Sequence, residues 1–215
     1  MIAAPSFTVD PALAGIVRAG VLWWDGATVV EHAASLERLL AEAEALVRRM
    51  PPEETAAVRT MYKRVGLDPT KTRPSNEALL RRIRKGGQIP RINSMVDVIN
   101  WCSVELQLPY GLYDRARMRG APTLRLGREG ESYAGIRKDE VHVAGRITVA
   151  DDEGPFGNPT SDSARTMVTA ETRDALVVVY APAAIQPARL ATVLDTTASR
   201  LALVCGGREA GRWHA

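Results

Sequence analysis

The order of the expected secondary-structure elements constrains this chain most. Helical spacing of apolar residues predicts an early run of helices, at residues 35–50, 52–65, 75–86 and 92–107. Segments rich in valine and threonine predict later strands, at residues 123–127, 140–150, 164–169 and 174–182. A final helix is expected within residues 183–207. Because helices and strands form separate runs, the sequence predicts an α+β fold, with a mixed β-sheet flanked by helices.

The N-terminal part is expected to pack on a larger unit. Residues 1–50 are predicted to form short strands and a helix, against a main domain of residues 51–215. Ser75 is expected to cap the helix that it begins, because its hydroxyl can accept a free amide hydrogen. Gly86 and Gly87 are expected to supply the exit from that helix.

Composition narrows the class of protein. The 215 residues are 46% hydrophobic, which is enough for one sizeable core. No run of about 18 uncharged apolar residues exists, and no basic segment precedes an apolar one at the N-terminus, so neither a membrane span nor a signal peptide is expected. Two cysteines without a CxxC or Cys/His cluster argue against zinc and disulfides. A cytoplasmic protein without metal or cofactor is expected.

A polar stripe runs along the predicted helix at residues 92–107. Asn93, Asp97 and Asn100 are spaced i, i+4 and i+7, so they share one line beside the apolar face. The side expected to face water carries Ser94, Trp101 and Glu105. The stripe has two interpretations that are compatible: its side chains bond the backbone of a neighbouring loop, or they line a polar pocket.

Positive charge gathers in residues 71–91, which hold seven basic residues and one acidic residue. Such a segment is typical of a surface for a phosphate backbone, although a solvated helix face is the simpler interpretation. The residues predicted to contact RNA are Arg73, Arg81, Arg82, Arg84 and Arg91. Arginines after residue 114 favour a true basic surface.

Familiar catalytic motifs are missing. The sequence has no GxSxG elbow, no HExxH, no phosphate-binding GxxxxGK and no GxGxxG. Three histidines offer no Ser–His–Asp arrangement. An enzyme of this sequence would position water with amides, hydroxyls and a carboxylate.

Several short motifs occur in an order that matches a known family. The segments NSMVDVINWCSVELQLPYGLYD, KTRPSNEALLRRIRKG and GNPTSDSARTMVTAET resemble the B3/B4 domain, the tRNA-editing module of the bacterial phenylalanyl-tRNA synthetase beta subunit. The resemblance covers roughly residues 55 to 205. It implies the B3/B4-like fold, and a free-standing module that hydrolyses mischarged aminoacyl-tRNA in trans, with tRNA as partner.

The resemblance also implies site residues. Asp162 and Asp97 are the candidate catalytic groups, which would orient water or the amino group of the substrate. Backbone amides of the loop at residues 154–161 are expected to face the developing oxyanion. Residues implied to contact the substrate are Asn93, Asn100, Tyr110, Gly111, Asn158, Ser161, Thr166 and Thr169.

One position departs from the family. Pro109 and Asp114 match the loop after the motif helix, but Gly111 stands where synthetase forms often carry a histidine. Two rival functions stay open: a non-catalytic RNA-binding module, and a sensor of free amino acids. The amino acid, the tRNA and the oligomeric state are not indicated by the sequence.

Overall fold

The longest apolar strand lies inside the central sheet. The computed structural model describes residues 6–51, 55–137 and 140–214. Strand β9 (Ala175–Pro182) is buried along its whole length, as its unbroken apolar sequence predicts. It lies between β2 (Val17–Asp25) and β3 (Tyr110–Asp114), and β10 (Arg208–His214) pairs with the far side of β2. All three pairings are antiparallel. The N-terminal region thus supplies an inner strand of the main sheet.

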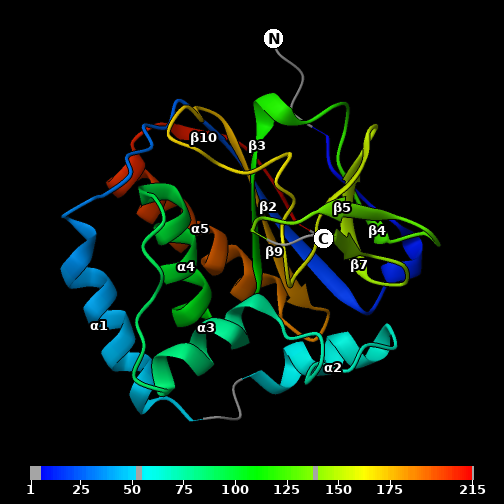
Figure 1. Cartoon of the computed structure of the whole chain (residues 1–215), viewed down its shortest axis with the longest axis horizontal. Coiled ribbons are helices and arrows are strands. Elements are labelled where there is room, and N and C mark those ends of the chain that lie inside the picture. Colours follow the sequence, from blue (N-terminus) through cyan, green and yellow to red (C-terminus); the bar gives the residue numbers. More distant parts are fainter. Residues whose placement is uncertain (1–5, 52–54, 138–139, 215) are drawn as a thin grey trace.

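A second sheet lies to the right of the first in Figure 1. Its order is β1 (Thr8–Val9), β4 (Thr123–Leu126), β7 (Ile147–Asp151) and β8 (Gly154–Gly157). A two-stranded ribbon of β5 (Ser132–Ala134) and β6 (Glu140–His142) stands beside it. Short 3-10 turns occur at Pro11–Leu13 and Arg115–Arg117. The α+β prediction, with a mixed sheet and helices, is confirmed.

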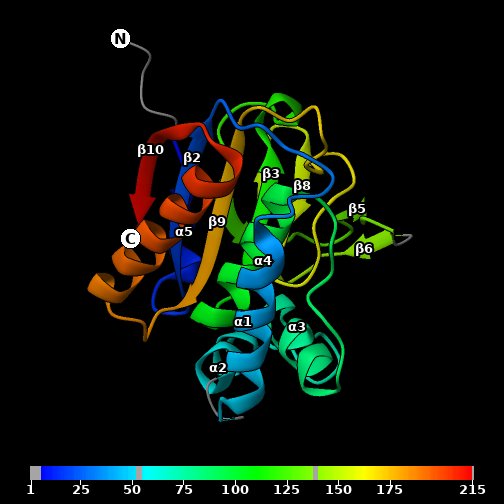
Figure 2. The ribbon, with the colours of Figure 1, turned by 90° about the vertical axis from the view of Figure 1, so that its left-hand side faces the viewer.

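Helices cover one face of the central sheet (Figure 2). Helix α5 (Pro187–Cys205) packs on β2 and β10, and α4 (Ser94–Leu106) packs on β3 and α5. Outside α4 lie α1 (Leu36–Arg49) and α3 (Ser75–Arg84), while α2 (Ala56–Arg64) lies below them and reaches β9. None of the described helices is both long and apolar enough to cross a bilayer.

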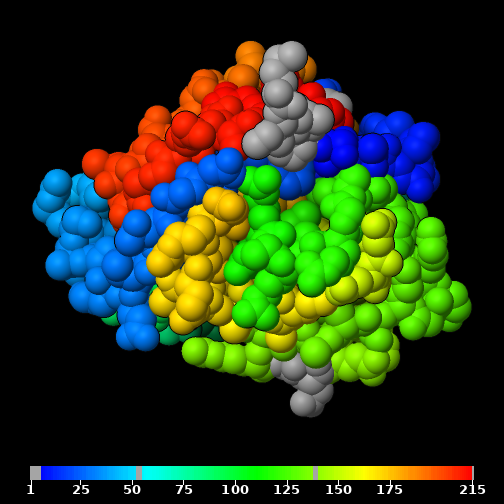
Figure 3. All heavy atoms as spheres, turned by 90° about the horizontal axis from the view of Figure 1, so that it is seen from above, coloured from blue at the N-terminus to red at the C-terminus, as the bar shows by residue number. Residues whose placement is uncertain are grey.

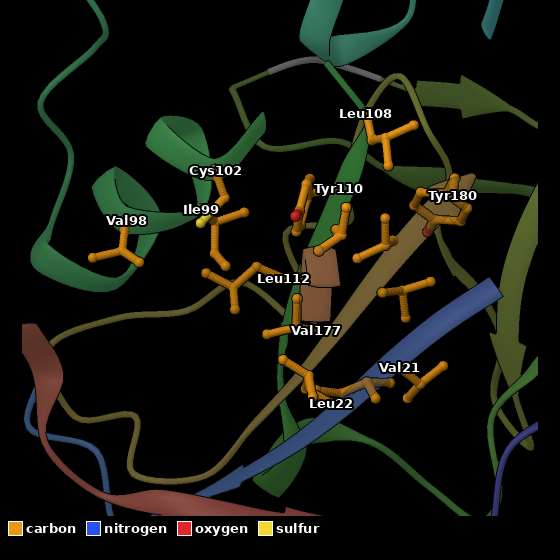
Figure 4. Close-up of a cluster of buried hydrophobic side chains, with 14 of the residues drawn as sticks. Val21, Leu22, Val98, Ile99, Cys102, Leu108, Tyr110, Leu112, Val177 and Tyr180 are labelled. Carbon is orange, nitrogen blue, oxygen red and sulfur yellow. The ribbon is translucent and has the colours of Figure 1, made fainter. Parts of the chain in front are cut away.

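Helix α4 is buried on nearly every side. Figure 4 shows Ile99 and Cys102 beside Tyr110 and Leu112 of β3, in the layer between α4 and the sheet. The expectation that Ser94, Trp101 and Glu105 face water is wrong, because α5 covers that side. Arg200 of α5 stacks on the Trp101 ring at 3.6 Å and forms an ion pair with Glu105.

Several predicted elements differ from the structure. The strand predicted at residues 164–169 is an irregular segment, and the strand predicted at 140–150 is two short strands joined by a turn. Ser75 does not cap α3, because Pro74 occupies the cap position and Ser75 is the first helical residue. The predicted start of the second helix, at Pro52, falls outside the described residues. Gly86 does end α3, with a positive φ of 87°.

The irregular segment closes one end of the molecule. Residues 163–174 lie between residues 26–35 and 115–121 in Figure 3. Main-chain hydrogen bonds join them: Asp114 donates to Thr166, and Ala27 donates to Arg173. This segment also forms one wall of the cavity described next.

Candidate functional site

An apolar cavity of about 280 Å³ lies between helices α3 and α4 on one side and strand β3 and residues 136–137 and 162–168 on the other. Its lining is mostly apolar, and its polar members are few. The lining residues are Ser75, Leu79, Ile92, Val96, Ile99, Asn100, Ser103, Tyr110, Leu112, Ile136, Arg137, Asp162, Met167 and Val168. Ile92 and Met167 are exposed, at 43% and 36%, so they mark the mouth. A small cavity of this kind suits one amino-acid side chain.

Asp162 is the one carboxylate among the described residues that line the cavity. Its Oδ1 accepts a hydrogen bond of 2.9 Å from the hydroxyl of Tyr113. Burial raises the pKa of Asp162 to about 7, although the hydrogen bonds from Tyr113 and from the N–H of Leu112 act in the opposite direction. At neutral pH this carboxyl group is therefore divided between its charged and neutral forms.

Tyr113 is held in a narrow slot. A Cβ atom on Gly111 or on Gly157 would lie 2.1 Å from its hydroxyl oxygen, so only glycine fits at these two positions. The same hydroxyl lies 2.6 Å from that of Tyr180, and the ring meets Phe156 edge-on at 4.8 Å. A histidine at residue 111 would therefore collide with Tyr113.

The polar stripe on α4 has two kinds of member. Asn93 caps the helix by accepting from the N–H of Val96 at 3.0 Å, and its amide donates to the carbonyl of Val168 at 3.3 Å. Asp97 accepts from the N–H of Ile92 at 2.8 Å. Because Ile92 and Val168 line the cavity, Asn93 and Asp97 hold its walls without lining it.

Asp97 is largely buried, and this burial raises its pKa, with the N–H of Ile92 and the charge of Arg91 opposing the shift. The two candidate carboxylates thus have different placements: Asp162 lines the cavity and Asp97 supports it.

Asn100 is the stripe residue that lines the cavity. It is half-buried, and its side chain has no hydrogen-bond partner among the described residues. Two serines lie on the same side of the cavity. The hydroxyl of Ser75 is buried without a partner among the described residues, whereas Ser103 donates to the carbonyl of Leu108 at 2.8 Å. Asn100 and Ser75 are therefore free to bond a ligand.

The loop at residues 158–161 is folded on itself. The N–H groups of Thr160 and Ser161 donate to Oδ1 of Asn158, at 2.8 and 3.0 Å, and the N–H of Asn158 donates to the carbonyl of Ser161. Of the amides at residues 154–161 that were expected to face an oxyanion, those of Asn158, Thr160 and Ser161 therefore already have acceptors. The side-chain amide of Asn158 donates to Tyr133 at 2.7 Å, so Asn158 is buried outside the cavity.

The other predicted contact residues are scattered. Tyr110 lines the cavity while its hydroxyl lies 3.0 Å from that of Thr197. Thr166 and Thr169 do not line it; Thr166 is fully buried, and the hydroxyl of Thr169 donates to Glu171 at 2.5 Å. Gly111 and Ser161 also lie outside the lining.

The predicted RNA-contacting arginines divide into two groups. Three of them are engaged within the protein: Arg73 with Glu77, Arg91 with Glu37 and Glu44, and Arg84 with the carbonyls of Met50 and Pro51. Arg81 and Arg82 are exposed, and their side chains form no bond or ion pair within the part of the chain that the structure describes.

Sequence reasoning missed three residues of the site. Arg137 lines the cavity mouth, exposed and with a positive φ of 54°. Tyr113 bonds Asp162 and Tyr180 bonds Tyr113, both from strands whose sequences resemble ordinary buried segments. The alternation of glycine and tyrosine in PYGLYD was the one available signal, since residues two apart on a strand share a face.

A model of the B3/4 domain matches residues 57–202 of this chain. The phenylalanine–tRNA ligase beta subunit of Brucella abortus is 31% identical over 86 residues, which cover 40% of this chain and 11% of that protein. The beta subunit of Streptomyces avermitilis is 34% identical over 93 residues, covering 43% of this chain and 11% of the relative.

A solved structure shares the fold. An N-terminal fragment of the phenylalanyl-tRNA synthetase beta subunit from Pyrococcus horikoshii superposes with a TM-score of 0.51 and 13% identity, covering 98% of this chain and 54% of the fragment. At this identity the likeness concerns the fold. The resemblance read from the sequence motifs is confirmed.

Proposed function

The chain belongs to the B3/4 domain family, and on that premise we propose that it hydrolyses the ester bond of mischarged aminoacyl-tRNA, acting in trans. The observation that carries the proposal is the cavity, which is small, apolar and provided with one carboxylate. Two of its lining residues, Asn100 and Asp162, belong to the motifs that define the resemblance. The relatives named above are ligases of a tRNA, which supports an aminoacyl-tRNA substrate.

The proposed reaction needs little chemical assistance. Water adds to the ester carbonyl carbon, the bond to the ribose oxygen breaks, and a proton from the water passes to that oxygen. An aminoacyl ester is already activated, so orienting the water and the substrate supplies much of the rate. Asp162 orients the amino group of the substrate or the attacking water, and Asn100 offers an amide to the reacting carbonyl. Asp97 holds the wall at Ile92.

The acceptor end of the tRNA would approach across α3. Arg82 follows Leu79 by three residues and Ser75 by seven, so all three share one helix face. Ser75 and Leu79 line the cavity. Arg137 lies at the mouth. Arg82 and Arg137 would meet the phosphates next to the esterified ribose.

The direct test is hydrolysis of a panel of mischarged tRNAs by the protein in excess. We expect at least one to lose its amino acid faster than in buffer, and Asp162→Ala to abolish that gain. Tyr62→Phe is the control, because Tyr62 is buried but its hydroxyl contacts Thr160 and not Asp162. Absence of hydrolysis across the whole panel would refute the enzymatic proposal.

The rival candidate is a non-catalytic RNA-binding module, favoured by the free arginines of α3. The two candidates separate in one comparison, since Asp162→Ala should stop turnover and leave tRNA binding intact. Binding that persists in the wild-type protein with no turnover of any mischarged tRNA would favour the module.

A further inference from the structure

Asp162 has no cationic partner among the residues that the structure describes. Its hydrogen-bond donors are the neutral hydroxyl of Tyr113, at 2.9 Å, and the main-chain N–H of Leu112. Arg137 lines the same cavity, yet no ion pair joins the two, and no other ion pair to Asp162 occurs within residues 6–51, 55–137 and 140–214. A carboxylate in an apolar wall is costly unless it is paired, so the bound ligand is the natural source of the missing charge.

The surroundings of Asp162 limit what this ligand can be. A divalent cation would need several oxygen ligands, and the described lining offers one carboxylate among mostly apolar side chains. A guanidinium group would need a wider planar set of acceptors. An ammonium group is compact and is satisfied by one carboxylate with neighbouring hydroxyl or amide oxygens, such as those of Asn100 and Ser75.

We propose that Asp162 is the receptor for a primary ammonium group, so that the cavity takes molecules with a free α-amine beside an apolar side chain and rejects their N-acylated forms. The proposal deepens the proposed function, because it specifies the substrate as an aminoacyl group and excludes peptidyl and formylated esters. It also stands without hydrolysis, since it concerns binding.

Tyr113 is the positioning residue for this receptor. Its hydroxyl packs closely against Gly111 and Gly157 and lies 2.6 Å from the hydroxyl of Tyr180. The Tyr113 hydroxyl is therefore fixed in position. It donates to Oδ1 of Asp162. The main chain of Asp162 is fixed too, by the N–H of Ile136 donating to its carbonyl and by a bridge to Gly157. A receptor held this firmly loses little entropy on binding.

Small amides test the binding claim without RNA. Phenylalaninamide and leucinamide carry the ammonium group; 3-phenylpropanamide and 4-methylpentanamide have the same skeletons without it; the N-acetyl amides carry a blocked nitrogen. Titrations followed by NMR report weak affinities. We expect at least one amine to bind about tenfold or more tightly than its two matched neutral analogues, as for a hydrogen bond to a charged group.

Variants assign the preference to Asp162. Asp162→Asn keeps the shape of the side chain and removes its negative charge. The amine should then bind no more tightly than its neutral analogues, and the affinity of those analogues should not change. Tyr113→Phe should reduce the advantage, and Tyr62→Phe should leave it intact. Equal binding of amines and neutral analogues by the wild-type protein, or no binding of any amine at millimolar concentration, would overturn the proposal.

Hydrolysis provides the second arm. Leucyl-tRNA and phenylalanyl-tRNA are compared with their N-acetyl forms. Equal hydrolysis of free and acetylated esters would refute the ammonium receptor and leave the deacylase intact. Amine binding that depends on Asp162, without hydrolysis of any ester, would support the ammonium receptor and refute the deacylase.

Discussion

The hydroxyl of Thr172 donates a hydrogen bond of 2.8 Å to Oδ2 of Asp114, a residue 58 positions earlier in the chain. The other carboxylate oxygen of Asp114 accepts from the N–H of Ala116 at 2.9 Å, and the main-chain N–H of Asp114 donates to the carbonyl of Thr166. Two motif segments that are distant in sequence are thereby joined at the end of β3. The motif aspartate and threonine are structural residues here.

Asp114→Ala should lower the free energy of unfolding by about 2–3 kcal/mol, because it leaves the buried hydroxyl of Thr172 and the N–H of Ala116 without an acceptor. Thr172→Val should cost about 1 kcal/mol, and the double variant less than the sum. Urea unfolding of the single and double variants measures these free-energy changes. Asp195→Ala, which removes an exposed carboxylate on α5, is the control. A cost for Asp114→Ala no larger than the control's would contradict the assignment.

Gly111→Ala should destabilise the fold by about 1–3 kcal/mol, because the new methyl group meets the hydroxyl of Tyr113 at 2.1 Å. The same change in a Tyr113→Leu background should cost much less, since the colliding atoms are gone. Thermal unfolding of the four proteins in this cycle checks the coupling. Equal costs in both backgrounds would show that the slot is not what requires glycine.

Asn93→Ala and Asn100→Ala should separate stability from activity. Asn93 caps α4 and holds Val168, so its removal should cost about 1–2 kcal/mol of unfolding free energy. Asn100 lines the cavity without a partner in the described structure, so its removal should change stability little and slow deacylation. Denaturant unfolding and single-turnover hydrolysis provide the two readouts, and the reverse pattern would refute the division.

The stability difference between Asp162→Asn and the wild-type protein should grow with pH. Asp162 has a pKa of about 7 in the folded chain and an ordinary value of 3.8, so between these values the folded state holds a proton that the unfolded state has lost. The stability that this proton provides is complete below about pH 4 and is lost as the pH rises through 7.

The variant is neutral at every pH, so its advantage should reach about 2–4 kcal/mol by pH 8, after allowance for partial exposure. The hydroxyls of Tyr113, Tyr180 and Tyr133 face this carboxylate, and burial raises the pKa of each, so none titrates in this range. Melting temperatures of both proteins from pH 4 to pH 8 test this prediction. A difference between them that stays constant with pH would contradict the raised pKa of Asp162.

Arg82→Ala should weaken tRNA binding and reduce the slope of log affinity against log salt by about 1, because one phosphate contact is lost. Arg189→Ala removes the same charge from an exposed position on α5, on the far side of α4, and should have little effect. Fluorescence anisotropy across a salt series measures both slopes. Equal effects of the two variants would place the RNA elsewhere.

The helices and the central strand could be predicted from sequence because their signals are local. Apolar spacing predicted α1, α4 and α5, and the run at residues 174–182 predicted β9. The strands β5, β8 and β10 were not predicted, since each is defined by its partner across the chain. The same limit explains the error at residues 164–169, where valine and threonine serve tertiary contacts.

The site was predictable only in part. Asn100 and Asp162 were found through motifs, and both line the cavity. Tyr113 and Arg137 were missed, because their roles arise from which strands and loops meet at Asp162, and no spacing rule expresses that. The positive charge on α3 was visible in the sequence, but the engagement of Arg91 by Glu37 and Glu44 required the fold.

The pairing of β2 with β9, which runs from Val17 opposite Pro182 to Trp24 opposite Ala175, also governs how the protein is made. A ribosome releases β2, with Trp23 and Trp24, long before it has translated β9. During that interval the nascent chain carries an apolar strand with an open edge, which is a target for aggregation and for chaperones. Completion of the central sheet must therefore wait until β10, at Arg208–His214, has also been synthesised.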